Sequence, residues 1–585
     1  MKKEEGTAFL LQPPHTYKKL KELHMVAAIE LQDVSFKYDS QSEPTLHHIN
    51  LTIAPGERVL LSGPSGSGKT TLGQLLNGLI PHAYQGEVTG NIKINGHDIK
   101  DASIFERSFD IGTVLQDTDT QFVGLTVAED IAFALENDHV GHDELLTKVK
   151  QWAQTLQLDK LLKAAPQELS GGQKQRVAMA GVLIDDSPIL LFDEPLASLD
   201  PASGHRMLAL LDELQEKYHL TVIMIEHRLE DVLQHRLDRV VVLDKGEVTF
   251  DGTPETILRS NTLHQYGLAM PGYLQLLELA GVDLTALTQI TQPENVTGSD
   301  VKSKLQALVP RPQVAHQENE RNPILTVNHL GFQYSDQQLF KDVSMQLFKG
   351  ELVALVGKNG SGKSTLSKLI AGFMQPSSGS MLLNGVGDLA QLSIKERADY
   401  IGYVSQNPND MVTQSIIYDE VASGLRLRGK SESDIQERVN RLLKLAGLYG
   451  MREWPVTVLS YGQKKRLTII SVLALEPEVL ILDEPTSGQD YANAQAIMQF
   501  VQDLNATFNT TVVVITHDMS LMLEIADRAL VLVDGQVLAD TTPAKLLNDQ
   551  NLVDQADLHI TTIHELAQQY DLANPAGLTA LIGKG

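Results

Sequence analysis

The chain repeats itself once, and this repeat limits the possible folds more than any other feature of the sequence. Two Gly-rich loops that contain Lys69 and Lys363 lie 294 positions apart. Later equivalent residues are only 290 positions apart, because the first copy is longer between residues 81 and 90. The 585 residues therefore form a tandem duplication with at least two domains. Four further pairs of equivalent residues share an offset of 290 positions: Gln116 and Gln406, Ser170 and Ser460, Glu194 and Glu484, and His227 and His517.

Each copy has the residue pattern of an α/β domain. It opens with an alternating segment, residues 29–38 and 325–334, that predicts a strand. Four apolar runs are too short for helices and lie between helical patterns, so they predict central parallel strands. These runs are residues 188–195, 221–227, 478–485 and 511–517. The pattern between Gln116 and Ser170 is helical. We therefore predict two tandem α/β domains, each with a parallel or mixed sheet core and a helical insert.

The sequence also indicates where the domains begin and end. "TPETIL" follows the first copy and "TPAKLL" the second, so each copy is expected to carry its own C-terminal appendix. Residues 291–321 are rich in Pro, Gln, Asn and Ser and predict a free linker. The segment before Ile29 is either a disordered arm or the result of a start codon misplaced ahead of Met25. The expected division is an N-terminal extension 1–28, a first domain 29–258, an appendix and linker 259–322, a second domain 323–548, and a C-terminal helical appendix 549–585.

The composition argues against several kinds of protein. A net charge of −26 is repelled by phosphate backbones, which disfavours nucleic acid as the primary partner. The absence of cysteine excludes disulfides, thiolate zinc sites and iron–sulfur clusters. We find no run of ~18 apolar residues, the length that a membrane helix needs. If the protein works in transport, we expect another chain to supply the membrane path.

Both Gly-rich loops match the phosphate-loop pattern G-x-x-x-x-G-K-[ST]. The glycines let backbone N–H groups converge on phosphates, and each loop opens a helix whose N-terminus is partly positive. The lysine is expected to reach the β- and γ-phosphates of ATP, and the next hydroxyl to ligate Mg²⁺. The expected binding residues are Gly63, Pro64, Ser65, Gly66, Ser67, Gly68, Lys69, Thr70 and Thr71 in the first copy, and Gly357, Lys358, Asn359, Gly360, Ser361, Gly362, Lys363, Ser364 and Thr365 in the second.

An acidic pair ends one predicted strand in each copy. In these pairs, Asp193-Glu194 and Asp483-Glu484, the aspartate suits Mg²⁺ and the glutamate can polarise the attacking water as a general base. A histidine, His227 or His517, follows the next apolar run. A lone histidine is usually structural, but beside these motifs its imidazole is placed to contact a γ-phosphate.

These motifs, in this order, resemble the ABC ATPase family. The order in the first copy is the phosphate loop, Gln116, "LSGGQKQR" at residues 169–176, Asp193-Glu194, "SLD" at 198–200, and His227. The second copy repeats it with Gln406, "LSYGQKKR" at 459–466, Asp483-Glu484, "SGQD" at 487–490, and His517. The Ser-x-Gly-Gln signature is specific to this family, and the resemblance covers nearly everything from residue 29 to about residue 540.

The resemblance implies a head-to-tail sandwich of two P-loop ABC ATPase domains with ATP at both interfaces. Each phosphate loop would face the signature of the other copy, so Ser460 and Gly462 would complete the site of Lys69. Ser170 and Gly172 would complete the site of Lys363. The catalytic residues would be Glu194, Glu484, His227, His517, Gln116 and Gln406. The Mg²⁺ site would use Thr70, Gln116 and Asp193 in one copy, and Ser364, Gln406 and Asp483 in the other.

Three aromatic residues carry further expectations from the same resemblance. Tyr38 and Tyr334 match the tyrosine that stacks on adenine, although each is also typical of a core or edge strand. Tyr461 stands where the first signature has Gly171. We expect this tyrosine to pack between the halves rather than to act in catalysis.

Three kinds of ABC ATPase remain to be weighed. DNA-repair and ribosome-recycling members need cysteine-bound metal, and this chain has no cysteine. A translation-associated tandem ATPase acting on ribosomes would carry a long charged linker. The net charge of −26 on the present chain would also disfavour binding to RNA. Residues 117–137, which follow Gln116, resemble instead the energy-coupling factor (ECF) importers of vitamins and transition metals. The second copy departs from that pattern, with Met411 where the first has Gln121.

An ECF importer implies two membrane partners for this chain. These are an integral membrane coupling protein and a small-molecule-binding membrane subunit, with the ATPase at the cytoplasmic face of the membrane. A fusion of both ATPases resembles the subgroup linked to thiamine precursors such as hydroxymethylpyrimidine. The substrate stays open between such a vitamin precursor and a transition metal, because the ATPase does not touch the cargo.

Overall fold

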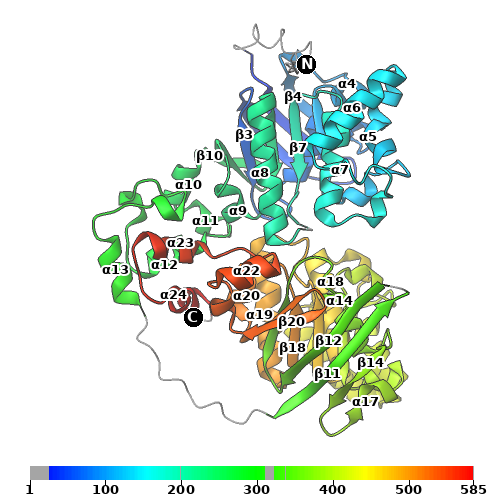
Figure 1. The fold of residues 1–585 in the computed structure, drawn as a ribbon. Coiled ribbons are helices and arrows are strands. Elements are labelled where there is room, and N and C mark those ends of the chain that lie inside the picture. Colours follow the sequence, from blue (N-terminus) through cyan, green and yellow to red (C-terminus); the bar gives the residue numbers. More distant parts are fainter. Residues whose placement is uncertain (1–25, 198, 310–321, 336, 584–585) are drawn as a thin grey trace, which may run out of the picture.

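A computed structural model describes residues 26–197, 199–309, 322–335 and 337–583. It shows two halves of the same architecture, one above the other, with smaller helical segments from both halves meeting beside them (Figure 1). All but the last three residues of the predicted N-terminal extension lie outside the described residues. The domain boundaries given above remain our proposal.

A six-stranded sheet forms the centre of the first half. Its strands are β3 (Arg58–Ser62), β6 (Ile111–Val114), β7 (Ile189–Asp193), β8 (Thr221–Ile225), β9 (Arg239–Asp244) and β10 (Glu247–Gly252). The order is β10-β9-β3-β8-β7-β6, and all neighbours are parallel except β10, which pairs antiparallel with β9. Every residue of β3 and β8 is buried, as in strands covered on both faces. The central parallel strands predicted from the short apolar runs are confirmed.

A four-stranded antiparallel sheet covers part of this core. It contains β1 (Ile29–Tyr38), β2 (Leu46–Ile53), β4 (Gly86–Ile94) and β5 (His97–Asp98), in the order β2-β1-β4-β5. In β1 the buried residues alternate, with a break between Leu31 and Val34. The ladder shifts register at that point, and Asp33 there has φ +53°, so a bulge moves the apolar face by one residue.

The second half repeats both sheets. The antiparallel sheet, in the order β12-β11-β14-β15, contains β11 (Pro323–Tyr334), β12 (Gln337–Phe348), β14 (Ser378–Leu383) and β15 (Gly387–Asp388). The central sheet, in the order β16-β17-β18-β13-β19-β20, contains β13 (Leu352–Val356), β16 (Ile401–Val404), β17 (Val479–Asp483), β18 (Thr511–Ile515), β19 (Arg528–Val533) and β20 (Gln536–Thr541). The α/β fold class predicted from the repeat is therefore confirmed for both copies.

Helices cover the sheets of both halves. Those of the first half are α2 (Lys69–Asn77), α3 (Leu79–His82), α4 (Ile104–Ser108), α5 (Val127–Asn137), α6 (His142–Thr155), α7 (Gly171–Leu183), α8 (Pro201–Tyr218) and α9 (Leu229–Leu233). Those of the second are α14 (Lys363–Ala371), α15 (Ile394–Arg397), α16 (Ile417–Leu427), α17 (Glu432–Leu445), α18 (Tyr461–Leu473), α19 (Tyr491–Phe508) and α20 (Met519–Ile525). In the part of the chain that the structure describes, none of the helices has both the length and the apolar character of a membrane span.

The two appendices pack against each other (Figure 1). The first contains α10 (Pro254–Arg259), α11 (Thr262–Gln265), α12 (Gly272–Leu279) and α13 (Val301–Leu308), and the second α21 (Pro543–Leu546), α22 (Gln550–Ala556), α23 (Thr562–Gln569) and α24 (Pro575–Ile582). Ile563 and Leu566 of α23 are buried in one cluster with Leu274 and Leu277 of α12. Tyr570 donates a hydrogen bond of 2.7 Å to the carbonyl of Val296. The two ends of the repeat thus share one core.

The prediction of a free linker over residues 291–321 is wrong for its first part. Residues 293–295 form a 3₁₀ turn, α13 follows, and the side chains of Val296, Val301 and Leu305 are fully buried. The polar composition concealed these few apolar residues, which are spaced so that the shared appendix core can bury them. Residues 310–321 lie outside the described residues.

Candidate functional site

The two phosphate loops have a backbone that only glycine allows at its key positions. Gly63 has φ +144° and Gly357 φ +139°, and a Cβ on either would lie about 2 Å from a carbonyl oxygen of β9 or β19. The ammonium of Lys69 donates to the carbonyls of Gly63 at 2.8 Å and Pro64 at 2.9 Å, and Lys363 repeats this geometry in its own loop. These loops therefore curl around their lysines as the sequence pattern predicts.

The strand-end glutamates lie in a matching cluster in each half. The Gln116 amide donates to Glu194 at 2.6 Å, and the His227 imidazole lies 3.3 Å from the other carboxylate oxygen. The second half repeats the cluster, with 2.8 Å from Gln406 to Glu484 and 3.2 Å from His517 to Glu484. The backbone of Glu194 has φ +48° and that of Glu484 φ +45°, a strained region for a residue with a side chain. In each half the structure thus brings together the three residues predicted to be catalytic.

Burial and neighbouring charges separate the pKa values of the two acidic residues. Burial raises the pKa of Asp193 to about 6, with the charge of Glu194 acting in the same direction. Burial also acts to raise the pKa of Glu194, but the hydrogen bond and charge of His227, together with Lys69, outweigh it and hold that pKa below its usual value. Glu484 and Asp483 show the same contrast. Each site therefore pairs an ionised glutamate with an aspartate whose ionised form a nearby cation would stabilise.

The donor sets fit Mg²⁺ bound together with a phosphate ligand. Among the described residues, one carboxylate oxygen of Asp193 is buried without a hydrogen-bond partner. In the second half the Ser364 hydroxyl lies 3.2 Å from Asp483, so a hydroxyl and a carboxylate converge there. No group of three or more acidic or histidine side chains in the described ranges is arranged to hold a metal alone. One carboxylate, one hydroxyl and substrate oxygens are a typical Mg²⁺ environment.

The predicted adenine tyrosines lie beside the phosphate loops. The Tyr38 hydroxyl is 3.1 Å from that of Thr71, and the Tyr334 hydroxyl is 3.2 Å from that of Thr365. Each ring also packs edge-on against a phenylalanine two residues earlier in its strand. The placement suits a stacking role, which remains a prediction.

The signature motif has a local structural role that its residue types explain. Ser170 and Ser460 are the N-caps of α7 and α18, and each backbone N–H donates at 2.9 Å to the side chain of the glutamine three residues later. Ser-x-x-Gln is thus a capping box at a helix N-terminus, an end that favours anions. The hydrogen bonds described for these serines lie within their own caps. Their pairing with the opposite phosphate loop, with Gly172 and Gly462, stays a prediction.

Two aspartates that we did not assign to the site connect the halves. The backbone N–H of Asn359 in the second phosphate loop donates to Asp200 at 3.2 Å. In the reciprocal contact, the N–H of Ser65 donates to Asp490. Each aspartate also caps the helix that follows it, α8 or α19. Ser198, in the first of these loops, lies outside the described residues.

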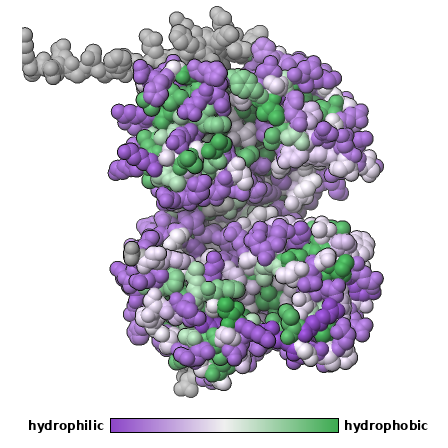
Figure 2. Space-filling view, turned by 90° about the vertical axis from the view of Figure 1, so that its right-hand side faces the viewer, coloured by the Kyte–Doolittle hydropathy of each residue, from purple (hydrophilic) through white to green (hydrophobic). Residues whose placement is uncertain are grey.

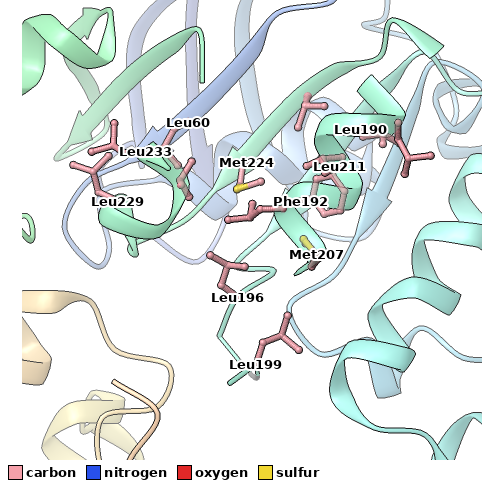
Figure 3. Packing of buried hydrophobic residues seen from close by; sticks show 14 of the residues in the cluster. Leu60, Leu190, Phe192, Leu196, Leu199, Met207, Leu211, Met224, Leu229 and Leu233 are labelled. Atoms are coloured by element: carbon pink, nitrogen blue, oxygen red, sulfur yellow. The ribbon is translucent and has the colours of Figure 1, made fainter. Parts of the chain in front are cut away.

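The first of these loops is anchored in the core of its own half. Leu196 and Leu199, on the segment that leaves the core below Phe192, are buried with Met207 (Figure 3). Glu226 adds a polar anchor, because its carboxylate accepts the N–H of Leu196 at 3.1 Å. The position of Asp200 against the opposite phosphate loop is thereby set by the first half.

Two residues that differ between the copies reach the second site, and sequence reasoning missed them. Tyr403, where the first copy has Thr113, donates to Asp483 at 2.9 Å. Lys465, where the first copy has Gln175, donates to the backbone carbonyls of Gln406 and Glu484. Alignment at the 290-residue offset exposes both differences, so the signal was present in the sequence.

The structure describes two departures that we did notice. Gln121 and Met411 occupy equivalent places in the two halves. The side chain of Gln121 accepts the N–H of Leu115, just after β6, at 3.2 Å, and the sulfur of Met411 accepts the N–H of Ser405, just after β16, at 3.1 Å. The Tyr461 hydroxyl lies 3.5 Å from the carbonyl of Gln406 in its own half. Its packing between the halves stays a prediction.

Comparisons with family models and with related proteins point to the same family as the motifs. The family model described as "ABC transporter" matches residues 46–197 and 340–487, just over half of the chain. The model described as "ATP-binding cassette cobalt transporter" matches residues 260–332. A "Putative ABC transporter ATP-binding protein" of Lactiplantibacillus plantarum is 51% identical over 553 residues, covering 94% of this chain and 97% of that protein. One from Enterococcus faecalis is 49% identical over 549 residues, covering 94% and 96%. A solved structure, cbiO1 from Clostridium perfringens, described as part of the ABC transporter complex cbiONQ, is 32% identical. It covers 42% of this chain and 99% of that chain, with a TM-score of 0.38.

Proposed function

Since this chain belongs to the ABC transporter family of ATP-binding proteins, which are ATPases coupled to transport, we propose that it is the energy-coupling subunit of an ECF-type importer. The observation that carries the ATP-hydrolysing part of the proposal is the Gln–Glu–His cluster, which is present beside a phosphate loop in both halves. The importer part is supported by the family model that matches residues 260–332. The contacts of Asp200 and Asp490 with the opposite loops support a shared use of both sites by the two halves.

The residues of each site divide the work of ATP hydrolysis. The phosphate loop and its lysine hold the phosphates, and Mg²⁺, when bound near Asp193 or Asp483, neutralises their charge. Glu194 and Glu484 are ionised and oriented by a glutamine amide, so each is placed to accept a proton from the attacking water. His227 and His517 lie beside the second carboxylate oxygen. In this proposal their imidazoles contact the γ-phosphate.

Exposed apolar residues support docking to a membrane partner. In the first half, Val123 and Leu125 lie within the segment that follows Gln116, and Leu125 is 82% exposed. In the second half, Phe373 and Ile394 line a cavity of about 260 Å³ that also includes Met411. Figure 2, which faces the side of α4 to α7, shows apolar patches on both halves. Water-exposed apolar patches of this kind mark interaction sites. We propose that they bind an integral membrane coupling protein at the cytoplasmic face.

The match of residues 260–332 to a cobalt-transporter model supports a micronutrient importer. The cargo is then a transition metal such as cobalt, or a vitamin precursor such as hydroxymethylpyrimidine, bound by a separate membrane subunit. The alternative, a soluble ATPase acting on ribosomes, has no such support.

Co-purification from detergent-solubilised membranes tests the proposal. The wild-type chain should bring down multi-helix membrane proteins, and Leu125→Asp combined with Phe373→Asp should abolish this while ATP binding persists. Leu279→Asp, which changes a leucine 53% exposed on α12, is the matched control and should have no effect. Recovery with ribosomes instead of membrane proteins would contradict the proposal.

A further inference from the structure

One charged side chain below the second site is fully buried. Lys465, on α18, is 0% exposed, and the charges of Glu484 and Asp483 act on its ammonium. Its acceptors are two backbone carbonyls, those of Gln406 and of Glu484, the latter at 3.2 Å. The ammonium also lies 5.7 Å from the ring centre of Tyr461. Burial lowers the pKa of Lys465 to about 8 although the charges of Glu484 and Asp483 act to raise it, so burying this ammonium is costly and its presence needs a reason.

The first half has a different residue at the position equivalent to Lys465. Gln175, at the equivalent position of α7, is buried and donates to the carbonyl of Pro195, one residue past Glu194. Its neutral amide reaches one loop. The longer lysine reaches two loops, and its hydrogen bonds are charge-assisted and therefore stronger than those of an amide.

The two carbonyls held by Lys465 belong to residues whose side chains must meet. The Gln406 amide donates to the Glu484 carboxylate at 2.8 Å, and Glu484 has the strained φ of +45°. The N–H of Glu484 is fixed at 3.0 Å by the carbonyl of Ile515, as the N–H of Glu194 is at 2.8 Å by Ile225. The lysine holds the carbonyl of the same residue, which belongs to the next peptide, between Glu484 and Pro485. A residue whose two flanking peptides are both held keeps the strained conformation that aims its carboxylate.

We propose that Lys465 is a positioning residue of the second ATP site. It holds the backbone carbonyls of Gln406 and Glu484 at a fixed position relative to each other. The inference rests on the proposed function. Because Lys465 is rooted in the helix that starts at Ser460, it also joins the second site to the signature predicted to complete the first. The two sites then differ: the glutamate–glutamine pair of the second is held by a fixed cation, and that of the first is not.

Site-resolved kinetics test the proposal. In a Glu194→Gln background, single-turnover hydrolysis reports the second site, and its activity with Lys465 present shows first whether that site works at all. Lys465→Met should lower the second-site rate constant by about tenfold or more, with the KM for ATP changed by less than about threefold. Lys465→Arg should restore the rate to within about threefold. Lys465→Gln, the residue that the first half tolerates, should fold normally and lie in between.

A matched substitution in the first half provides the control. Gln175→Met in a Glu484→Gln background should change the first-site rate by less than about threefold. No hydrolysis by Glu194→Gln with Lys465 intact would count against the proposed function. Second-site activity that survives Lys465→Met and Lys465→Gln within twofold would overturn the positioning role. Equal losses of hydrolysis rate from Lys465→Met at the second site and from Gln175→Met at the first would also overturn it, because they would indicate a general packing role for this position.

Discussion

Removing one side chain from α23 should destabilise the first half of the chain, although α23 belongs to the second. Leu566 is fully buried in the same cluster as Trp152 of the first half's helical insert. Leu566→Ala removes its apolar contacts and leaves a cavity at the junction of the two appendices. Fully buried leucines changed to alanine cost about 2.7–5 kcal/mol, and the value rises with the cavity that remains. We expect about 3 kcal/mol here, because α12, α23 and α24 confine the site.

The two tryptophans allow this to be measured in the full-length chain. Trp152 lies in the first half and Trp454 in the second, and the sequence has no others. In a Trp454→Phe protein, urea unfolding followed by Trp152 fluorescence should show a lower midpoint after Leu566→Ala. Leu473→Ala, which changes a buried residue of the separate second-half core, is the control and should leave that midpoint in place. A shift below about 0.5 kcal/mol for Leu566→Ala would refute a shared core.

Three further predictions follow from the sites and the appendices. Glu194→Gln with Glu484→Gln should keep nucleotide binding but lower ATP hydrolysis by ~10²–10⁴-fold, and near-normal turnover would remove both from the role of base. Measured with Glu484→Gln present, Tyr461→Gly should change ATPase activity by less than about tenfold, whereas Gly462→Val should disable the first site; equal damage would place the tyrosine at the nucleotide. Burial raises the pKa of Glu230, which contacts α23, to about 7, so the stability that the protonated acid provides is complete below about pH 4.5 and is lost as the pH rises through 7. Glu230→Gln should therefore gain up to about 3 kcal/mol over wild type in urea unfolding between pH 5 and pH 8, and a constant difference would contradict the raised pKa.

The sequence by itself determined the fold class and the composition of each site. Short buried runs such as residues 189–193 could only be central strands, because strand type depends on local length and apolar content. The phosphate loops were equally local, since the geometry at Gly63 follows from a backbone that no other residue can adopt without a clash. Glu194 and Gln116 were identified by motif, and the common sheet edge brought them together.

Only the tertiary structure decided how the halves meet. Asp490 reaches Ser65 from 425 positions away, and nothing in either local sequence encodes that contact. Alignment of the two copies shows that Lys465 differs from Gln175, but the role of Lys465 could not be read from local patterns, because its acceptors lie on other elements. The folding of residues 293–308 could not be read from them either, because its apolar partners lie on other elements. Periodicity reports what one element buries, whereas the partner that buries it is set by the packing of whole halves, which depends on the sum of many distant contacts.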